Sequence, residues 1–502
     1  MKKLLKKTCL AIALASVLSS CGTFFPTSTI TSSSSSVSYT SFTCQAAMIT
    51  PYQGKVHISD EAGVKKVGTT YTVYPFDTSA EMKYYVAAPS STEAASRDTA
   101  FEDSFSDAFQ RYHALFDRHN NYCDDNGLIN NVKVLNDSYG SGKAVVLDEE
   151  LYTSLKEAVN FCSTVKGKFN IGIGNLSTIW DFYISASITY DDSYTDEMKQ
   201  CFVDSENQRR VVFVDPPANW IAHGVKTTPT YEELSSCLVF DDGAKAVTFS
   251  PISRIDDYLA SDEAKNIVSA AKSFGMDLGK PSITLGGFGK GEATELFADK
   301  YPQKPFLINS GASSVKCNVG KPDGSGWNLT IANPFYYEAN REAYFADLNL
   351  NAADLVLQAE GTFNMSTSGY YNQYYYAKQS DGSYLLRCHI IDASSPSTPG
   401  YSHSYFAATS VLMNDSGLAD MITTSLMNTD SVQEAESLLK TISEAYPGED
   451  IHSFYLVNDS SSSSKKTTCF AEEAIYDKFK FSKDVFPTYY TFTPITTLSK
   501  IS

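Results

Sequence analysis

A glycine-rich stretch, residues 282–295, constrains the fold of this chain more than any other part of its sequence. It reads S-I-T-L-G-G-F-G-K-G-E-A-T-E. Alternation of apolar residues at 283–285 predicts a buried strand, and residues 293–300 predict a helix. Between them lie four glycines, a residue type that tolerates a positive φ or close backbone approach: Gly286, Gly287, Gly289 and Gly291. Strand, glycine turn and helix together predict either a phosphate site at a helix N-terminus or a tight structural turn.

Lys290 lies among these glycines and adds a positive charge to the turn. A P-loop has Ser or Thr directly after its lysine, whereas Gly291 follows Lys290 here. The stretch therefore does not match a P-loop, and at this point phosphate contact and a purely structural turn remain equal alternatives.

The overall charge of the chain limits its partners. The 502 residues carry a formal net charge of −18, and 42% of them are apolar. This length allows two to three domains with a large core. Nucleic-acid binding demands basic surfaces, so we expect no nucleic acid as a partner, while an acidic protein is compatible with divalent cations.

The N-terminus has the layout of a secretory signal. Four lysines precede the apolar residues 10–18, and the sequence Leu18-Ser19-Ser20-Cys21 follows. Small residues before a cysteine resemble a bacterial lipobox. We therefore predict a lipoprotein signal peptide at 1–20 and a lipid-modified (palmitate-carrying) Cys21. The alternative is an ordinary signal peptide that is cleaved nearby.

Serine and threonine dominate residues 21–43, which predicts a flexible tether. With the lipid anchor, this places the protein at the cell membrane, on its extracytoplasmic face. No other stretch reaches 18 apolar residues, so we expect no transmembrane helix.

The remaining chain alternates helical and strand patterns. Helices are predicted at 101–118, 148–162, 231–237, 255–274, 293–300, 418–427 and 432–442. Strands are predicted at 83–87, 246–249, 305–308, 327–331, 354–359, 384–391 and 406–413.

Four blocks in this part of the chain stand out together. They are Leu-Gly-Gly-Phe-Gly-Lys-Gly at 285–291, Ser-Thr-Ser-Gly-Tyr at 366–370, His-Ile-Ile-Asp at 389–392, and Leu-Ala-Asp-Met-Ile-Thr-Thr-Ser-Leu at 418–426. In this order they resemble the motifs of the ApbE family of FAD:protein FMN transferases, from about Thr72 to Val457. Gly-Lys-Phe-Asn at 167–170, ahead of Trp180, resembles a further segment of that family.

The resemblance implies an α+β fold of the ApbE type, with mixed and antiparallel sheets packed against helices. It implies a flavin transferase domain at 44–457 with an insertion near 184–280. Residues 458–502 would then be a C-terminal extension.

The resemblance also implies a reaction. Family members are Mg²⁺-dependent and transfer FMN from FAD to a Thr or Ser hydroxyl of another protein, with release of AMP. The expected partners are thus FAD, as the substrate, and an extracytoplasmic acceptor flavoprotein. Nothing in the sequence names that acceptor.

The expected metal ligands are Asp420, Thr424 and Gly289. Asp420 and Thr424 are four residues apart, which places both on one helical face, and their oxygens suit Mg²⁺. A backbone carbonyl in the glycine motif is the third ligand in the family, here that of Gly289. His389 is the expected catalytic general base towards the acceptor hydroxyl.

Six residues are expected to bind the flavin cofactor-substrate on the strength of the same motifs. They are Gly286, Gly287, Lys290, Thr367, Ser368 and Gly369.

Simpler roles remain open for two of these residues. Asp420 could serve as a favourable charge near a helix start, and His389 could be a hydrogen-bonded core histidine. The chain also departs from the family pattern at Asn170, Thr284 and Glu292, where the family has Asp, Asp and Tyr. An alternative function is therefore an FAD-binding lipoprotein with weak or no transferase activity. A solute-binding lipoprotein would share the anchor and explain none of the four blocks.

Overall fold

A computed structural model describes most of the chain. The described residues are 29–31, 37–50, 55–59, 74–90, 93, 95–188, 202–204, 211–311, 313–332, 353–370, 373–459, 466–486 and 496–501. The predicted signal peptide and Cys21 lie outside them. Helices and antiparallel sheets are mixed along the chain, which confirms the predicted α+β class.

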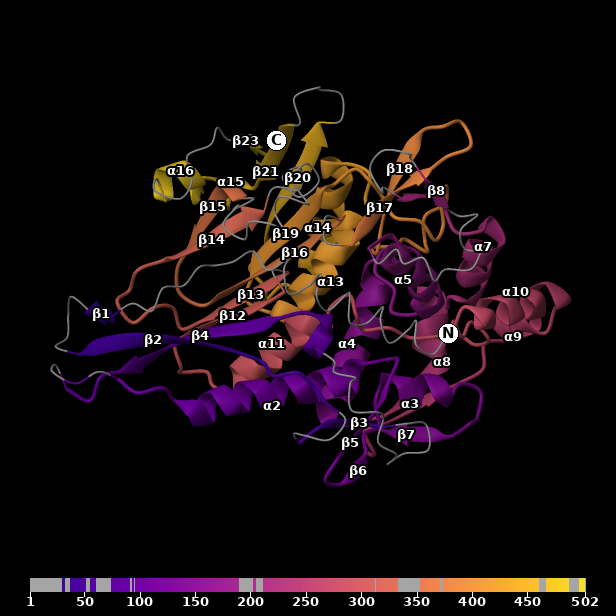
Figure 1. The fold of residues 1–502 in the computed structure, drawn as a ribbon, viewed down its shortest axis with the longest axis horizontal. Helices are drawn as coiled ribbons and strands as arrows, with labels where there is room; N and C mark the ends of the chain where they lie inside the picture. Colours follow the sequence, from indigo (N-terminus) through magenta and orange to yellow (C-terminus); the bar gives the residue numbers. More distant parts are fainter. Residues whose placement is uncertain are drawn as a thin grey trace.

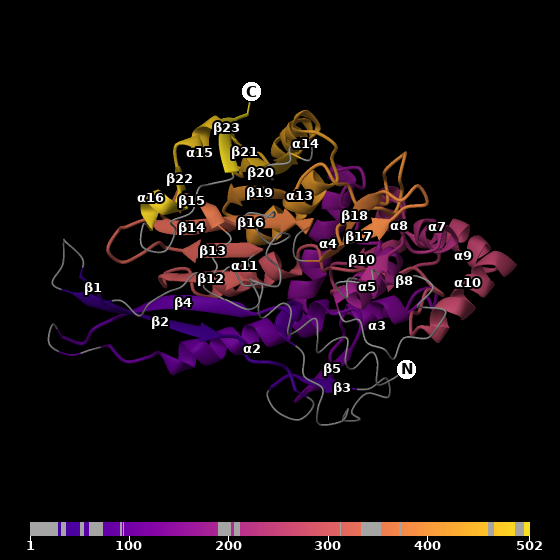
Figure 2. The ribbon, with the colours of Figure 1, turned by 45° about the horizontal axis from the view of Figure 1, so that its top comes forward.

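A ten-stranded sheet forms the centre of the fold, in the order β1-β2-β4-β12-β13-β16-β19-β20-β21-β23. Figure 2 shows these strands following one another from β2 near the bottom to β23 near the top. All neighbours are antiparallel except β21 and β23. The strands are β1 (Thr29–Thr31), β2 (Ser38–Gln45), β4 (Ala80–Ala87), β12 (Phe306–Ser310), β13 (Ser314–Asn318), β16 (Phe363–Gly369), β19 (Ala408–Met413), β20 (His452–Asp459), β21 (Lys466–Ala471) and β23 (Thr496–Lys500).

The ten-stranded sheet includes residues that the sequence predicted to lie outside the folded domain, in the tether and in the C-terminal extension. β2 begins at Ser38, inside the predicted tether 21–43, because its aromatic and β-branched residues favour a strand beside β4. At the other end, β21 and β23 lie within 458–502, the predicted C-terminal extension, and pair with each other in the same sheet. Neither segment is thus a separate appendage where the structure describes it.

Three helices cover one face of this sheet: α2 (Thr99–Phe116), α11 (Gly289–Lys300) and α13 (Ser416–Met427). α11 contacts both α2 and α13, and α13 lies on β16 and β19 (Figure 1). Strand alternation separates the two faces. The Tyr84 ring contacts Phe101 of α2 at 5.5 Å between centroids, whereas Tyr85 faces Trp327 at 6.1 Å, on the opposite side.

Smaller sheets and helices complete the fold. The three-stranded sheets are β10-β11-β7, β14-β15-β22 and β3-β5-β6, and β18-β17-β9-β8 is four-stranded. Their strands are β3 (His57–Ser59), β5 (Asn121–Asp124), β6 (Gly127–Leu128), β7 (Ala144–Val146), β8 (Phe202–Asp204), β9 (Val211–Phe213), β10 (Leu238–Asp241), β11 (Ala246–Phe249), β14 (Trp327–Ala332), β15 (Ala353–Ala359), β17 (Tyr374–Lys378), β18 (Tyr384–Cys388) and β22 (Phe479–Phe481). The other helices are η1 (Pro75–Asp77), α3 (Val132–Asp137), α4 (Glu149–Thr164), α5 (Gly174–Ile188), α7 (Ala218–Thr227), α8 (Tyr231–Cys237), α9 (Ser253–Leu259), α10 (Asp262–Ser273), α14 (Val432–Ala445), α15 (Glu473–Tyr476) and α16 (Ser482–Val485).

Part of the predicted insertion, 184–280, has a hydrophobic cluster of its own. Trp180 of α5, Ile221 of α7, Ile267 of α10 and Tyr375 of β17 pack together there. The Trp180 indole also donates to the Gly400 carbonyl at 2.8 Å. This cluster joins the region to β17, which pairs with β18, the strand directly before His389.

Two local predictions were wrong. Residues 283–285 form no strand, because the Asn136 side chain bonds both the N–H and the carbonyl of Ile283, at 2.8 and 2.9 Å. The helix predicted at 255–274 is two helices, α9 and α10. Ser261 caps the second by accepting the Ala264 N–H at 3.2 Å.

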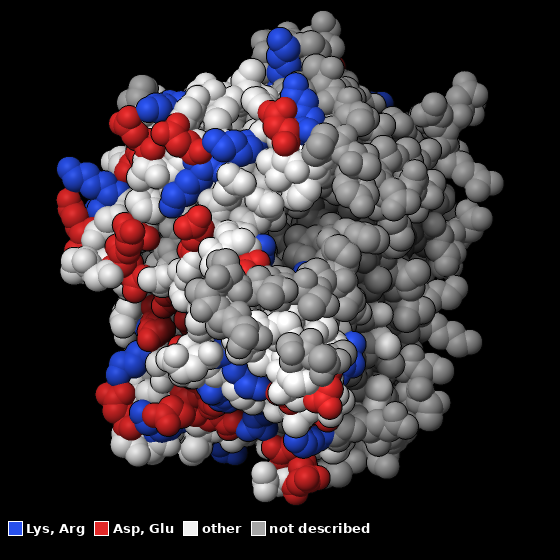
Figure 3. Space-filling view, turned by 90° about the vertical axis from the view of Figure 1, so that its left-hand side faces the viewer, with Lys and Arg blue, Asp and Glu red and all other residues white. Residues whose placement is uncertain are grey.

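Charged side chains of both signs share the surface. On the face shown in Figure 3, Lys and Arg lie among Asp and Glu over the described residues. Elsewhere, Lys133 pairs with Asp137 and Arg254 pairs with Glu233. No helix in the described part of the chain has the length and apolarity needed to cross a bilayer.

Candidate active site

Helix α13 holds Asp420 inside the protein. Asp415 caps the helix by accepting the Leu418 N–H at 2.8 Å. The helix is buried on nearly all sides, and Asp420 is its only ionisable residue, with 4% of its surface exposed. A buried carboxylate must be hydrogen-bonded or balanced by a cation.

Three donors from three other elements meet the Asp420 carboxylate. Ser314 of β13 donates to Oδ1 at 2.5 Å, and Ser366 of β16 donates to the same oxygen. The Gly291 N–H of α11 donates to Oδ2 at 2.9 Å. Asp420 thus ties the glycine block to two strands of the large sheet.

Burial dominates the electrostatics of this carboxylate and raises the pKa of Asp420 above its ordinary value. The hydrogen bonds from Ser314 and Ser366, the charge of Lys290 and the Gly291 N–H oppose that rise without cancelling it. A cation bound at the carboxylate would lower the cost of its charge further.

The packing of α11 against α13 leaves no room for a side chain at Gly291. A Cβ there would lie 2.1 Å from the Ser416 carbonyl oxygen and 2.8 Å from Asp420 Oδ2. None of the glycines at 286, 287, 289 and 291 has a positive φ. Close approach of α11 to α13, rather than an unusual backbone conformation, therefore requires Gly291.

Thr424 lies one turn after Asp420, as its spacing predicted. Its hydroxyl donates to the Gly287 carbonyl at 3.2 Å and lies 3.5 Å from the Ser368 hydroxyl. Gly289, the predicted carbonyl ligand, is the first residue of α11, and its N–H bonds Leu285. The carbonyl that the structure joins to Thr424 is thus that of Gly287.

These oxygens suit a magnesium ion. Among the described residues, no three His, Cys, Asp or Glu side chains group so as to hold a metal. Mg²⁺, however, is often held by one carboxylate with substrate phosphates and waters, at bonds of about 2.1 Å that put neighbouring ligands about 2.9 Å apart. The Thr424 and Gly287 oxygens, 3.2 Å apart, come close to that spacing. The Asp420 carboxylate, one helical turn before Thr424, would supply a third hard oxygen.

His389 directly follows β18 and is half-buried. Its Nδ1 lies 3.4 Å from the Gln373 carbonyl, which accepts hydrogen bonds only, so Nδ1 carries the proton and Nε2 has the free lone pair. Burial and the nearby charge of Lys290 lower the pKa of His389 to about 4. Lys290 therefore acts on both His389 and Asp420, which places three of the sequence blocks within electrostatic reach of each other.

The Ser-Thr-Ser-Gly block divides between the two faces of β16. Ser368 faces α13 and lies 2.9 Å from the Thr423 hydroxyl, while Thr367 faces the other side and lies 2.8 Å from Ser410 Oγ. Gly369 ends the strand. Ser368 is therefore grouped with Thr424, whereas the Thr367 side chain is not.

Residues 221–446 match the ApbE family. They include all four of the blocks on which the resemblance was based, so the resemblance is confirmed over this part of the chain. The upstream Gly-Lys-Phe-Asn block lies outside the match.

Solved ApbE structures resemble the fold at low identity. Flavinyl transferase ApbE of Pseudomonas stutzeri, in its apo form, is 15% identical, with 81% of this chain and 95% of that chain covered and a TM-score of 0.48. Flavin transferase ApbE of Vibrio cholerae is 13% identical, with 80% of this chain and 95% of that chain covered and a TM-score of 0.47. The ApbE protein of Thermotoga maritima is 17% identical, with 76% of this chain and 92% of that chain covered and a TM-score of 0.47. No curated protein sequence gives a significant match.

A buried charge network lies beside the His389 segment, and no sequence pattern predicted it. Asp392, fully buried, accepts from Lys168 at 3.1 Å and from His403 Nε2 at 3.0 Å. Nδ1 of His403 in turn bonds Asp430 at 2.7 Å. Two of its members, Lys168 and Asp392, lie in sequence blocks that resemble family motifs, and these blocks could have indicated the network.

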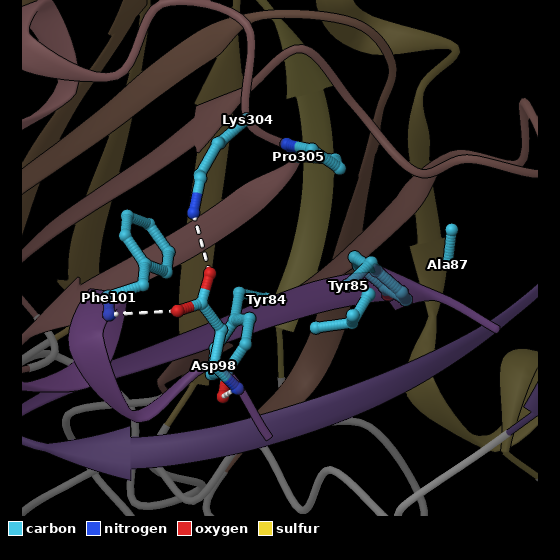
Figure 4. Close-up of a pocket in the computed structure, with 8 residues that line it drawn as sticks. Tyr84, Tyr85, Ala87, Asp98, Phe101, Lys304 and Pro305 are labelled. Atoms are coloured by element: carbon cyan, nitrogen blue, oxygen red, sulfur yellow. Dashed lines mark hydrogen bonds and ion pairs between the residues drawn. The ribbon is translucent and has the colours of Figure 1, made fainter. Parts of the chain in front are cut away.

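A separate pocket lies beside the C-terminal half of β4. None of the predicted site residues lines it. Its walls include Tyr84, Phe101 and the ion pair of Asp98 with Lys304, at 2.8 Å (Figure 4). Asp98 also caps α2 by accepting the Phe101 N–H at 3.1 Å. Its polar groups are thus engaged in holding α2 against the sheet.

Proposed function

We propose that this protein is a Mg²⁺-dependent FAD:protein FMN transferase that modifies a Thr or Ser hydroxyl of an extracytoplasmic protein and releases AMP. The observation that carries the proposal is the position of Asp420. Its carboxylate bonds the glycine block through Gly291 and the Ser-Thr-Ser-Gly strand through Ser366. Blocks far apart in sequence thus meet where the family resemblance expects one site.

The reaction exchanges the phosphoanhydride bond of FAD for a phosphoester bond to the acceptor. The acceptor hydroxyl oxygen forms a bond to the FMN phosphorus of FAD, and the P–O bond to the AMP phosphate breaks. Such transfers depend on positioning and charge neutralisation more than on covalent catalysis. The exposed Gly286–Gly287 turn at the start of α11 and the Lys290 charge are suited to a pyrophosphate.

Asp420 and Thr424, with a glycine-turn carbonyl, would hold the magnesium ion. When bound, Mg²⁺ would neutralise charge on the pyrophosphate oxygens.

His389 would act as the general base that takes the proton from the acceptor hydroxyl. Its Nδ1–H points to Gln373, so Nε2 is the nitrogen that accepts that proton. A pKa of about 4 keeps the ring neutral, and hence able to accept, over the physiological range. It also makes His389 a weaker base than an unperturbed histidine.

The alternative is an FAD-binding relative without turnover, and one observation favours it. Thr284, which stands where the family has Asp, uses its hydroxyl to accept the Gly286 N–H at 3.3 Å. The glycine turn is thereby shaped without a second carboxylate near the metal. Incubation of the protein with FAD, Mg²⁺ and a family acceptor protein separates the two functions. AMP release with covalent flavin on the acceptor, abolished by EDTA, supports the transferase; bound FAD without AMP supports the alternative.

We further propose that Cys21 carries a lipid and anchors the protein at the extracytoplasmic face of the cell membrane. The support is the lysine-rich, apolar segment followed by Leu-Ser-Ser-Cys. Labelling of cells with a palmitate analogue should mark the wild type and not Cys21→Ala. Equal labelling of both would show that the lipid is not on this cysteine.

A further inference from the structure

We propose that Ser314 and Ser366 are positioning residues, whose paired hydroxyls orient the Asp420 carboxylate so that it binds Mg²⁺ through Oδ2 alone. The inference rests on the proposed function only in taking Asp420 as a magnesium ligand. It concerns metal binding and makes no assumption about FMN transfer.

The first observation is the register of the sheet. Ser314 of β13 lies directly opposite Ser366 of β16, so the two side chains project side by side from the same face towards α13. Their exposed fractions are 0% and 1%. Two adjacent hydroxyls are therefore sealed between the sheet and the helix that carries Asp420.

The second observation is that both hydroxyls meet one oxygen atom. Ser314 and Ser366 both donate to Oδ1 of Asp420. A carboxylate oxygen has two lone-pair positions. Both positions on Oδ1 are thus occupied by protein donors, and that oxygen has none left for a metal.

The third observation concerns the other oxygen. Oδ2 of Asp420 accepts the Gly291 N–H at 2.9 Å, which uses one of its two positions. The one remaining acceptor position is on Oδ2. A carboxylate that offers a single oxygen suits the octahedral preference of Mg²⁺ better than the larger, often bidentate sites of Ca²⁺.

A purely structural role for the serines makes a different prediction. Hydroxyls that only fasten α13 to the sheet would, when removed, lower the melting temperature without changing the affinity of the folded protein for Mg²⁺. Partners that orient a metal ligand typically change metal affinity 10–100-fold when mutated. Metal affinity, measured apart from stability, therefore distinguishes the two roles.

The test is calorimetric titration of the purified protein with Mg²⁺ alone, without FAD. Ser314→Ala and Ser366→Ala are each expected to weaken Mg²⁺ binding by roughly 10–100-fold. Ser425→Ala is the matched control, because Ser425 is buried in the same helix and its hydroxyl bonds only the Met421 carbonyl, at 2.8 Å. The control should keep wild-type Mg²⁺ affinity.

Variants that fail to fold are replaced by Ser314→Cys and Ser366→Cys, which keep the shape but have a weak S–H donor. These should fold and still bind Mg²⁺ more weakly than the wild type. Ser366→Thr, which retains the hydroxyl, should restore affinity towards that of the wild type.

Wild-type Mg²⁺ affinity in both alanine or both cysteine variants would overturn the proposal, as would no Mg²⁺ binding by the wild type. Weakened binding in Ser425→Ala to the same degree would also overturn it. If the wild type binds Mg²⁺ and the serine variants bind it weakly, yet no AMP is released from FAD, the transferase proposal fails while this inference stands.

Discussion

The backbone N–H of Gly291 donates to Oδ2 of Asp420 at 2.9 Å, across the interface of α11 and α13. This bond joins the helix that follows the glycine turn to the helix that carries Asp420 and Thr424. It exists because Gly291 has no side chain. Any Cβ at this position would come within 2.1 Å of the Ser416 carbonyl oxygen.

Gly291→Ala is expected to force α11 and α13 apart. Overpacking of this severity should lower the free energy of unfolding by about 2 kcal/mol or more. Gly448→Ala is the control, because a Cβ at Gly448 would meet no atom within 4 Å. Thermal melts of both variants check the prediction. A Gly291→Ala protein as stable as the control would show that the helices can separate without cost.

Short-range features of the site could be predicted from the sequence. The Asp420/Thr424 pair needed only helical spacing, and α13 is present where its apolar pattern placed it. The helix after the glycines is also present, although it begins earlier, at Gly289. In these cases the residues that determine the structure are neighbours along the chain.

Features that depend on distant partners could not be predicted. Ser314 and Ser366 meet through strand pairing across 52 positions, which no local pattern reveals. The strand expected before the glycines is replaced by a single side chain, Asn136, which satisfies the backbone of Ile283. Sequence patterns report which residues are apolar, whereas such contacts depend on which segment folds back beside them.

Asp420→Asn is expected to abolish Mg²⁺ binding and AMP release while the fold is retained. The amide has nearly the shape of the carboxyl, and its Oδ1 can accept the Gly291 N–H while the Ser314 and Ser366 hydroxyls rotate to accept from Nδ2. Burial raises the pKa of Asp420, which means that the fold disfavours the charge that Asn removes. Magnesium titration, AMP assay and a melt on one preparation test this. Normal turnover of FAD by the variant would show that the metal assignment is wrong.

His389→Asn is expected to slow FMN transfer by roughly 10²–10⁴-fold through loss of the general base. FAD affinity should change little, because the glycine turn and the metal hold the pyrophosphate. The Asn amide can still donate to the Gln373 carbonyl, so the fold should persist. Rapid-quench transfer assays and FAD titration measure the two effects. If weakened FAD binding and a lower melting temperature appear together, His389 has a structural role instead.

The pH dependence of transfer provides an independent check on His389. Burial and Lys290 lower the pKa of His389 from 6.5 to about 4, so the ring is already neutral above pH 6. The wild-type rate should therefore show no histidine inflection near pH 6.5. Because the folded-state pKa is depressed, His389 contributes stability above pH 6.5, and this is lost as the pH falls towards 4. His389→Asn should lose less stability over that interval. An inflection near pH 6.5 that disappears in the variant would contradict the depressed pKa.

Glu292 is expected to make the protein less stable as the pH rises. The Glu292 carboxyl packs against Gly417 in the first turn of α13, so closely that a Cβ added to Gly417 would lie 2.1 Å from Oε2. The Ser154 hydroxyl donates to Oε1 at 2.7 Å. Burial raises the pKa of Glu292 to about 8, helped by the negative charges of Asp415, Glu157 and Glu295 and opposed by Ser154.

The sign follows from the two states of the chain. Between pH 4.5 and 8 the unfolded protein has lost the Glu292 proton and the folded protein has kept it, so stability falls as the pH rises. Glu292→Gln mimics the protonated form at every pH. The variant should match the wild type near pH 4.5 and exceed its free energy of unfolding by about 2–4 kcal/mol at pH 8. Melts of both proteins across this range measure the difference, with Glu360→Gln as the control at an exposed position. A stability difference between Glu292→Gln and the wild type that stays constant with pH would mean that Glu292 ionises normally in the fold.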